Sequence, residues 1–376
     1  MPRIICILLL LYCQCLTAQI KLSGKVLNSH DRKPLPFANV FLSNTTKGTL
    51  TNEAGVFELQ NLSKESYDLV VSYIGYETLT LKIRPDTLRG SLAVLLEPKA
   101  NELQEITIKR LRNGHEKYFT LFKENFIGRT VFSESCKLKN PKAVWFTDDE
   151  EEGIVNVNAD ELLVIENKAL GYIIKYQLES FTYNFRQNYV TTLGYPFFEE
   201  MTTRSERQRR RWAENRKKAY LGSMEHFLRS VYLERTTEEG FTIQKLIRKQ
   251  RNETAIADSD TTLRKMGSPN FSRYVQYLLK TPLQPNQITQ KQGELTQLVF
   301  DDFMYIVYEK EDEEPQFLKQ ISKQNYQVSI FRLVDGATLL SPNGYLPDPL
   351  AIVVEGRWGN EKLGELLPTD YLPTEK

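Results

Sequence analysis

Cysteine is scarce in this chain of 376 residues. Three of the four cysteines, Cys6, Cys13 and Cys15, lie within the first 15 residues, so a chain that loses its N-terminus keeps only Cys136. A single thiol cannot form an internal disulfide, and the fold must therefore depend on its hydrophobic cores. No histidine lies within twenty residues of Cys136 along the chain. We expect this cysteine to be a buried, unreactive side chain.

Histidine is equally rare, which weighs against several classes of enzyme. The three histidines are His30, His115 and His226, and none forms a zinc-binding pair at the usual spacing. The sequence also lacks a serine nucleophile elbow, a glycine-rich phosphate loop and a dinucleotide-binding fingerprint. No catalytic residue, metal ligand or cofactor is assigned. A glycosidase needs only two carboxylates, so 48 acidic residues leave that chemistry open.

The chain has no large excess of charge of either sign and no long apolar run. Its 49 basic and 48 acidic residues give a net charge of +1, so we expect no nucleic-acid partner. Its apolar segment from Ile4 to Leu11 is too short to span a bilayer. With Arg3 before it and Leu16-Thr17-Ala18 after it, this segment is typical of a secretory signal peptide at residues 1–18.

Lipidation at Cys13 or Cys15 is disfavoured because the bulky residues Tyr12 and Gln14 precede them. The predicted location is therefore outside the cytoplasm, in the periplasm or associated with the outer membrane, with no transmembrane span in the mature chain.

Aromatic residues are abundant, with 19 Tyr and 19 Phe, and this composition favours strands. From Ile20 to Leu96, short β-like runs alternate with turn signals, as in a small antiparallel sandwich. In one connection, Asn52 or Glu53 opens a turn and Gly55 supplies a positive φ; Gly75 does the same one hairpin later.

Four ordered segments carry a family resemblance. They are Leu22 to Val26, Pro34 to Val40, Gly48 to Phe57 and Val71 to Tyr76. Together they resemble the carboxypeptidase regulatory-like domain of the Bacteroidetes, which implies an immunoglobulin- or prealbumin-like β-sandwich. In that family the domain commonly precedes the barrel of an outer-membrane receptor. Fewer than 280 residues follow residue 100, too few for a plug and a barrel of about 22 strands.

The remaining chain reads as a larger β-rich α+β domain. A helix is predicted over Tyr118 to Ile127, followed by strand signals in several segments. We expect residues 148–152, Asp-Asp-Glu-Glu-Glu, to form a solvated hairpin tip and not a calcium site. The predicted fold class is mainly β, and residues 252–293 are left without an assigned structure. The predicted division is a signal peptide at 1–18, a sandwich at 19–98, a linker at 99–110 and a second domain at 111–376, with a helical insert near 203–234.

The strongest local signal is a basic segment from Ser205 to Lys218. Thr203 and Glu206 stand at capping-box spacing, a second helix opens at Ser223, and the two helices are predicted to form a hairpin on the sheet. The basic side chains could bind lipid phosphate, acidic glycan or an envelope protein. The alternative is a solvated face paired within the chain, for instance with residues 148–152. The candidate interaction patch is Arg207, Arg209, Arg210, Arg211, Arg216, Lys217 and Lys218.

Several strings in the second domain resemble uncharacterised Bacteroidetes proteins that carry the same regulatory-like domain, and this resemblance implies no chemistry. They are Asn140-Pro141, Tyr220 to Ser223, His226 to Arg229, Gly344 to Leu350, Glu355 to Trp358 and Leu366 to Tyr371. The leading prediction is an exported, non-catalytic binding or structural module of the cell envelope. The alternative is an envelope hydrolase that acts on glycan or peptide through carboxylates. A weaker hypothesis places a glycan or peptide ligand on Trp145, Trp212 or Trp358.

Overall fold

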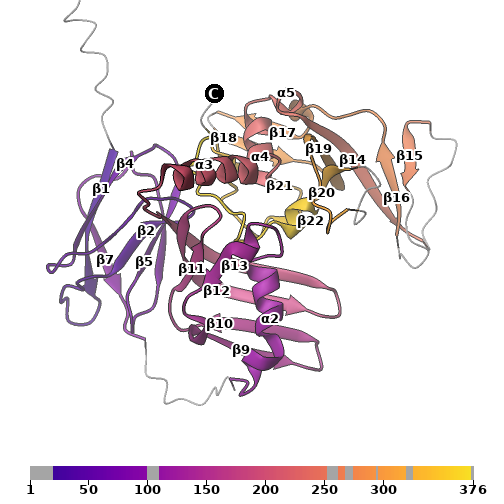
Figure 1. Ribbon diagram of the computed structural model, residues 1–376. Coiled ribbons are helices and arrows are strands. Elements are labelled where there is room, and N and C mark those ends of the chain that lie inside the picture. The colour runs from indigo at the N-terminus through magenta and orange to yellow at the C-terminus, as the bar shows by residue number, and fades with distance from the viewer. Residues whose placement is uncertain are drawn as a thin grey trace, which may run out of the picture. The chain divides into compact units, whose positions relative to one another are not determined.

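The computed structural model describes residues 20–99, 110–251, 261–266, 274–293, 295–318 and 325–373. The predicted signal peptide and most of the predicted linker lie outside these ranges. The chain divides into two compact units, Met1–Glu105 and Ile106–Lys376, and both are built mainly of strands (Figure 1). Across the described ranges, no helix has the length and apolar character needed to cross a bilayer.

The first unit is a β-sandwich, as predicted. Its core joins apolar side chains from two sheets, such as Leu22 and Val94 from one and Val40 and Leu69 from the other. The first sheet has the strand order β4-β1-β7 and the second β3-β2-β5-β6. The strands are β1 (Ile20–Asn28), β2 (Asn39–Leu42), β3 (Gly48–Leu50), β4 (Val56–Leu62), β5 (Tyr67–Ser72), β6 (Leu79–Ile83) and β7 (Leu92–Leu96).

The predicted turn before β4 is confirmed in its details. The Asn52 side-chain oxygen accepts hydrogen bonds from the backbone N–H groups of Ala54 (3.0 Å) and Val56 (2.9 Å). Gly55 has a φ of +74°, and a Cβ there would lie 2.6 Å from the carbonyl oxygen of Val26. Both the positive φ and the close approach of two backbones explain why glycine occupies this position.

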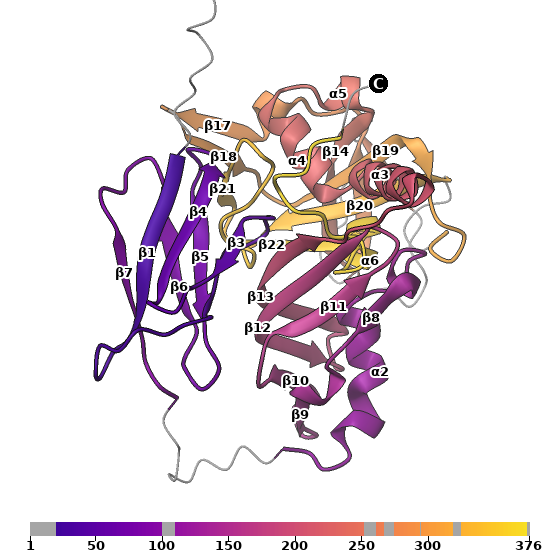
Figure 2. The same cartoon turned by 60° about the vertical axis from the view of Figure 1, so that its left-hand side comes forward.

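The second unit begins with a six-stranded sheet that is covered by a helix. The helix α2 (Gly114–Phe126) buries Tyr118, Phe122 and Phe126, which recur every four residues, in the core of this sheet (Figure 2). The path β8-β11-β12-β10-β9 has β13 paired beside β12. The strands are β8 (Cys136–Leu138), β9 (Val144–Asp149), β10 (Ile154–Ala159), β11 (Leu163–Asn167), β12 (Tyr172–Asn184) and β13 (Tyr189–Glu200).

A second six-stranded sheet, in the order β15-β16-β14-β19-β20-β22, and a three-stranded sheet, β17-β18-β21, complete the unit. Tyr274 to Leu279, unassigned from sequence, is the strand β16. The strands of the larger sheet are β14 (Phe241–Gln250), β15 (Leu263–Met266), β16 (Tyr274–Leu279), β19 (Phe303–Asp312), β20 (Tyr326–Leu333) and β22 (Ile352–Gly356). Those of the smaller sheet are β17 (Thr289–Gln292), β18 (Leu295–Val299) and β21 (Ala337–Leu340).

Two consecutive helices, α3 (Glu206–Tyr220) and α4 (Met224–Tyr232), occupy the predicted insert. The Ser223 cap of α4 is confirmed, because its hydroxyl accepts from the backbone N–H of His226. The cap of α3 is Ser205, not Thr203, and its hydroxyl accepts from the backbone N–H of Gln208. The pair does not lie on one sheet. Ala219 and Tyr220 of α3 belong to the core of the first sheet, whereas Phe227, Leu228 and Val231 of α4 belong to that of the second.

Two short helices, α5 (Thr236–Glu239) and α6 (Arg357–Asn360), follow later in the chain. The C-terminal segment after α6 is held by Arg229 of α4. The guanidinium of Arg229 donates to the carbonyl oxygens of Asn343 (2.6 Å), Thr369 (2.6 Å) and Tyr371 (3.0 Å). The indole N–H of Trp358 donates to the carbonyl oxygen of Gly222 (2.9 Å). These hydrogen bonds join the start of α4, α6 and the C-terminal segment at one structural junction of the second unit.

Candidate functional site

One side of α3 is fixed to the turn between β11 and β12. The Trp212 indole N–H donates to the carbonyl oxygen of Lys168 (3.0 Å), and the Asn215 amide donates to that of Ala169 (2.8 Å). Arg216 donates to the carbonyl oxygens of Leu170 (2.8 Å) and Gly171 (3.2 Å). Three side chains of one helix face thus satisfy four successive carbonyl groups, and α3 lies across this end of the first sheet (Figure 2).

The opposite side of α3 carries exposed cations. An α-helix advances about 100° per residue, so positions 207, 210, 211, 214, 217 and 218 share one face. This cationic face consists of Arg207, Arg210, Arg211, Lys217 and Lys218, all exposed, with Glu214 among them. Within the described ranges, none of the five cations forms an ion pair. The face is therefore a concentration of positive charge, five cations to one carboxylate, without a close ion pair among the described residues.

The remaining two residues of the predicted patch do not belong to the cationic face. Arg209 pairs with Glu206 (3.1 Å) and donates to the carbonyl oxygen of Thr203 (2.9 Å). The Arg216 side chain is only 12% exposed, stacks 3.9 Å above the ring of Tyr172 and pairs with Glu200. Both arginines are used within the fold, so the predicted patch of seven residues is reduced to five.

The acidic segment 148–152 is not the partner of α3. It forms the end of β9 and the turn to β10, in agreement with the predicted hairpin tip, and two of its five carboxylates pair with α2. Lys117 pairs with Asp148 (3.0 Å) and Glu150 (3.2 Å), and the Tyr118 hydroxyl donates to Asp148 (2.7 Å). These hydrogen bonds hold the pKa of Asp148 below its ordinary value, Tyr118 contributing most. The basic helix is solvated, as the alternative reading had it, but the suggested pairing of that helix with this segment was wrong, because Asp148 and Glu150 pair with Lys117 instead.

The tryptophans offer little surface for a ligand. Trp212 and Trp358 are buried, at 7% and 4% exposure, and both indole N–H groups donate to backbone carbonyl groups. Trp145 is half-buried; it donates to Asp160 (3.0 Å) and lies under the guanidinium of Arg110, 4.5 Å from the ring centre. The hypothesis of a glycan bound on Trp212 or Trp358 was therefore wrong.

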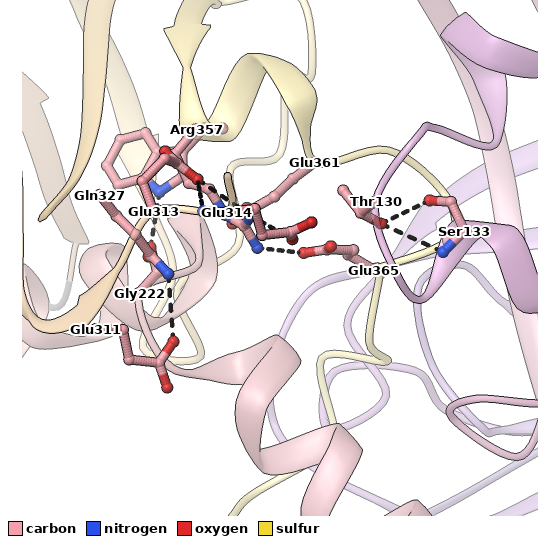
Figure 3. Close-up of polar contacts among 12 residues, drawn as sticks. Thr130, Ser133, Gly222, Glu311, Glu313, Glu314, Gln327, Arg357, Glu361 and Glu365 are labelled. Atoms are coloured by element: carbon pink, nitrogen blue, oxygen red, sulfur yellow. Dashed lines mark hydrogen bonds and ion pairs between the residues drawn. The ribbon is translucent and has the colours of Figure 1, made fainter. Parts of the chain in front are cut away.

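A second cluster of charges, which sequence reasoning missed, surrounds Arg357 in the interior of the second unit (Figure 3). The guanidinium of Arg357, with 7% of the side chain exposed, faces four carboxylates. They are Glu365 (2.7 Å), Glu314 (2.8 Å), Glu361 (3.2 Å) and Glu313 (3.5 Å). In the Arg357 cluster, four buried or partly buried carboxyl groups therefore share a single guanidinium.

The cluster lies where the end of β19 meets the C-terminal segment. Glu313 and Glu314 follow β19, and Glu361 and Glu365 follow α6. Neighbouring groups are Glu311, which accepts from the Gln327 amide (3.3 Å), and the Thr130–Ser133 hydroxyl pair (2.8 Å). Backbone bonds from Leu363 and Gly364 to the carbonyl oxygens of Phe126 and Ile127 join this segment to the end of α2. The Arg357 cluster thus lies where the two six-stranded sheets of the unit are joined.

Burial shifts the ionisation of these carboxyl groups. It raises the pKa of Glu361 to about 8 and raises the pKa values of Glu311, Glu313 and Glu365, because water no longer solvates their charged forms. The positive charge of Arg357 opposes the shift in all four. The sequence contains one local indication of this cluster: Arg357 precedes Glu361 by four residues and Glu365 by eight, close to the end of the chain.

Cys136 and His226 are both buried within the second unit. Burial raises the pKa of Cys136 to about 12, so its thiol stays protonated at neutral pH. The Nδ1 atom of His226 accepts from the backbone N–H of Gly222 (3.1 Å), which leaves a proton on Nε2 to donate to Glu239 (3.2 Å). Burial lowers the pKa of His226. Over the residues that the structure describes, no group of His, Cys, Asp and Glu is arranged to hold a metal ion.

Comparison with known proteins identifies the first unit. Residues 22–108 match the family described as the CarboxypepD_reg-like domain, which confirms the resemblance seen in the sequence; no family is identified for the rest of the chain. No curated protein matches the chain. A crystal structure of a protein of unknown function from Bacteroides fragilis NCTC 9343 is 11% identical and covers 89% of this chain and 96% of its own, with a TM-score of 0.18.

Proposed function

We propose that this chain is an exported, non-catalytic binding module of the cell envelope, and that the cationic face of α3 is its binding surface. One observation carries the proposal: five exposed cations share a single helix face and have no ion-pair partner in the described part of the chain. Like charges in a row repel one another, so the arrangement costs stability in the free protein. An anionic partner would relieve that repulsion.

The hydrogen bonds that attach α3 to the β11–β12 turn support a binding role. Because Trp212, Asn215 and Arg216 bond to four carbonyl groups of the β11–β12 turn, the helix backbone is already ordered before any ligand arrives. A preordered surface loses less conformational entropy on association than a flexible segment would. Little of the binding free energy that the five cations contribute is then needed to order the helix.

Three further features favour a non-catalytic module that is located in the cell envelope. The matched family is a regulatory-like domain, and no catalytic family was identified. The carboxylates that the structure gathers most closely, those of the Arg357 cluster, already pair with a guanidinium. The apolar segment and small residues before Gln19 support export.

The test is affinity capture from envelope extracts. Wild type is compared with the triple variant Arg207→Ser, Arg210→Ser, Arg211→Ser, and with Arg209→Ser as a control on the same helix, because Arg209 is paired with Glu206. We expect one component to be retained by wild type and the control, to elute with salt, and to be lost in the triple variant. Equal retention by all three proteins, or none by any of them, would contradict the proposal.

A further inference from the structure

The composition of the cationic face indicates what it contacts. Its residues, at positions 207, 210, 211, 214, 217 and 218, are arginine, lysine and one glutamate, with no apolar side chain among them. The apolar residues of α3, such as Trp212 and Tyr220, point into the fold. Protein–protein interfaces have an apolar, aromatic-rich centre and are depleted in lysine. Arginine is itself enriched at protein interfaces, so what sets this face apart is that it lacks the apolar or aromatic centre of a usual protein interface.

The cations are spread along a line. Arg207 and Lys218 are eleven residues apart, which corresponds to about 16 Å along the helix axis. A single phosphate ion could contact only part of such a row, whereas an extended layer of anions could contact all of it. Arginine forms bidentate hydrogen bonds with phosphate oxygens, and three of the five cations are arginines.

We infer that the cationic face docks on a membrane surface through phosphate-bearing anionic lipid headgroups. The inference rests on the proposed function and names the partner of the same surface. Each lysine or arginine near an anionic bilayer contributes enough to change the partition coefficient about fivefold. Removing three cations is then expected to weaken binding by about a hundredfold, and Glu214→Gln, which removes the one anion of the face, to strengthen it about fivefold.

The experiment is co-sedimentation with vesicles at low ionic strength. Three compositions are used: phosphatidylcholine alone, phosphatidylcholine with phosphatidic acid, and phosphatidylcholine with oleate at the same surface charge. The test variant is Arg207→Ala, Arg210→Ala, Arg211→Ala. A matched control removes three exposed lysines of the first unit, Lys25→Ala, Lys64→Ala, Lys99→Ala.

The expected result is binding to phosphatidic acid vesicles by wild type and the control, loss in the test variant, and a gain in Glu214→Gln. Equal binding to oleate vesicles would overturn the role of phosphate, and equal losses in test and control variants would overturn the role of α3. If wild type binds no vesicle but still captures a protein or glycan through Arg207, Arg210 and Arg211, the lipid inference falls and the proposed function stands. If neither the vesicle experiment nor the affinity capture gives the expected result, both the lipid inference and the proposed function are contradicted.

Discussion

Replacing Arg357 with methionine should unfold the second unit more readily, and the effect should depend on pH. The substitution keeps an unbranched apolar stem but removes the guanidinium, and with it the charge that faces Glu313, Glu314, Glu361 and Glu365. Breaking a buried ion pair by removing one partner costs about 3–5 kcal/mol. For a unit of this size, about 4 kcal/mol corresponds to a fall in Tm of about 10 °C.

The pH dependence follows from the carboxyl groups that remain. Burial raises the pKa of Glu361 from 4.5 to about 8, so the folded state binds more protons than the unfolded state between these values. The stability linked to Glu361 is therefore fully present below pH 4.5 and is lost as the pH rises through 8. Without Arg357 the folded-state pKa rises further, so the penalty of Arg357→Met should be largest at pH 8 and clearly smaller at pH 5.

Tryptophan fluorescence in urea is the assay, because all three tryptophans lie in the second unit and report its unfolding alone. Arg248→Met is the matched control: Arg248 pairs with one carboxylate, Glu355, which is 41% exposed. Its loss should cost about 1 kcal/mol at both pH values. The reasoning is refuted if Arg357→Met costs no more than Arg248→Met at pH 8, or if its cost is the same at pH 5.

Three further outcomes are expected. Glu361→Gln removes one titrating buried carboxyl group but keeps an acceptor for Arg357. It should therefore raise the free energy of unfolding at pH 8 and flatten the fall of that free energy between pH 5 and 8, as measured by urea denaturation. An unchanged dependence on pH would contradict this. Gly171→Ala would place a Cβ 2.3 Å from the Trp212 ring at a φ of +72°. It should therefore loosen the attachment of α3 and speed tryptic cleavage within this helix. An unchanged cleavage rate would contradict the role of these hydrogen bonds in holding α3. Cys136 should react with a thiol reagent at pH 8 only after denaturation, and rapid labelling of the native protein would contradict its burial.

The first unit was predictable because its signals are local. Turns at Asn52 and Gly55 and the alternation of apolar residues lie within a few positions of one another. The second unit was harder. β13 contains Gly194 and Pro196, which normally argue against a strand, yet it pairs only with β12 and an edge strand tolerates proline. The sequence shows two strand signals, Tyr172 to Leu178 and Phe181 to Phe185, but both belong to β12, in which a bulge between Leu178 and Ser180 interrupts the alternation.

The two charged sites show where local patterns fail. The cationic face was predicted because its spacing is a property of one helix. The burial of Arg216 was not, since its partners are the backbone carbonyl groups of Leu170 and Gly171, 45 or more residues earlier. The acidic run that contains Glu313 and Glu314 resembles a solvated segment in sequence. The side chains of Glu313 and Glu314 are nevertheless largely covered, and both pair with Arg357, which lies 43 residues after Glu314.

Lysine footprinting can show whether the cationic face of α3 contacts the envelope. The protein is acetylated briefly, with and without envelope fractions, and the modification of each lysine is read by mass spectrometry. We expect Lys217 and Lys218 to become protected, while Lys25 and Lys64 of the first unit, equally exposed, keep their reactivity. Unchanged reactivity of Lys217 and Lys218 in the presence of bound envelope material, with protection elsewhere, would contradict the account.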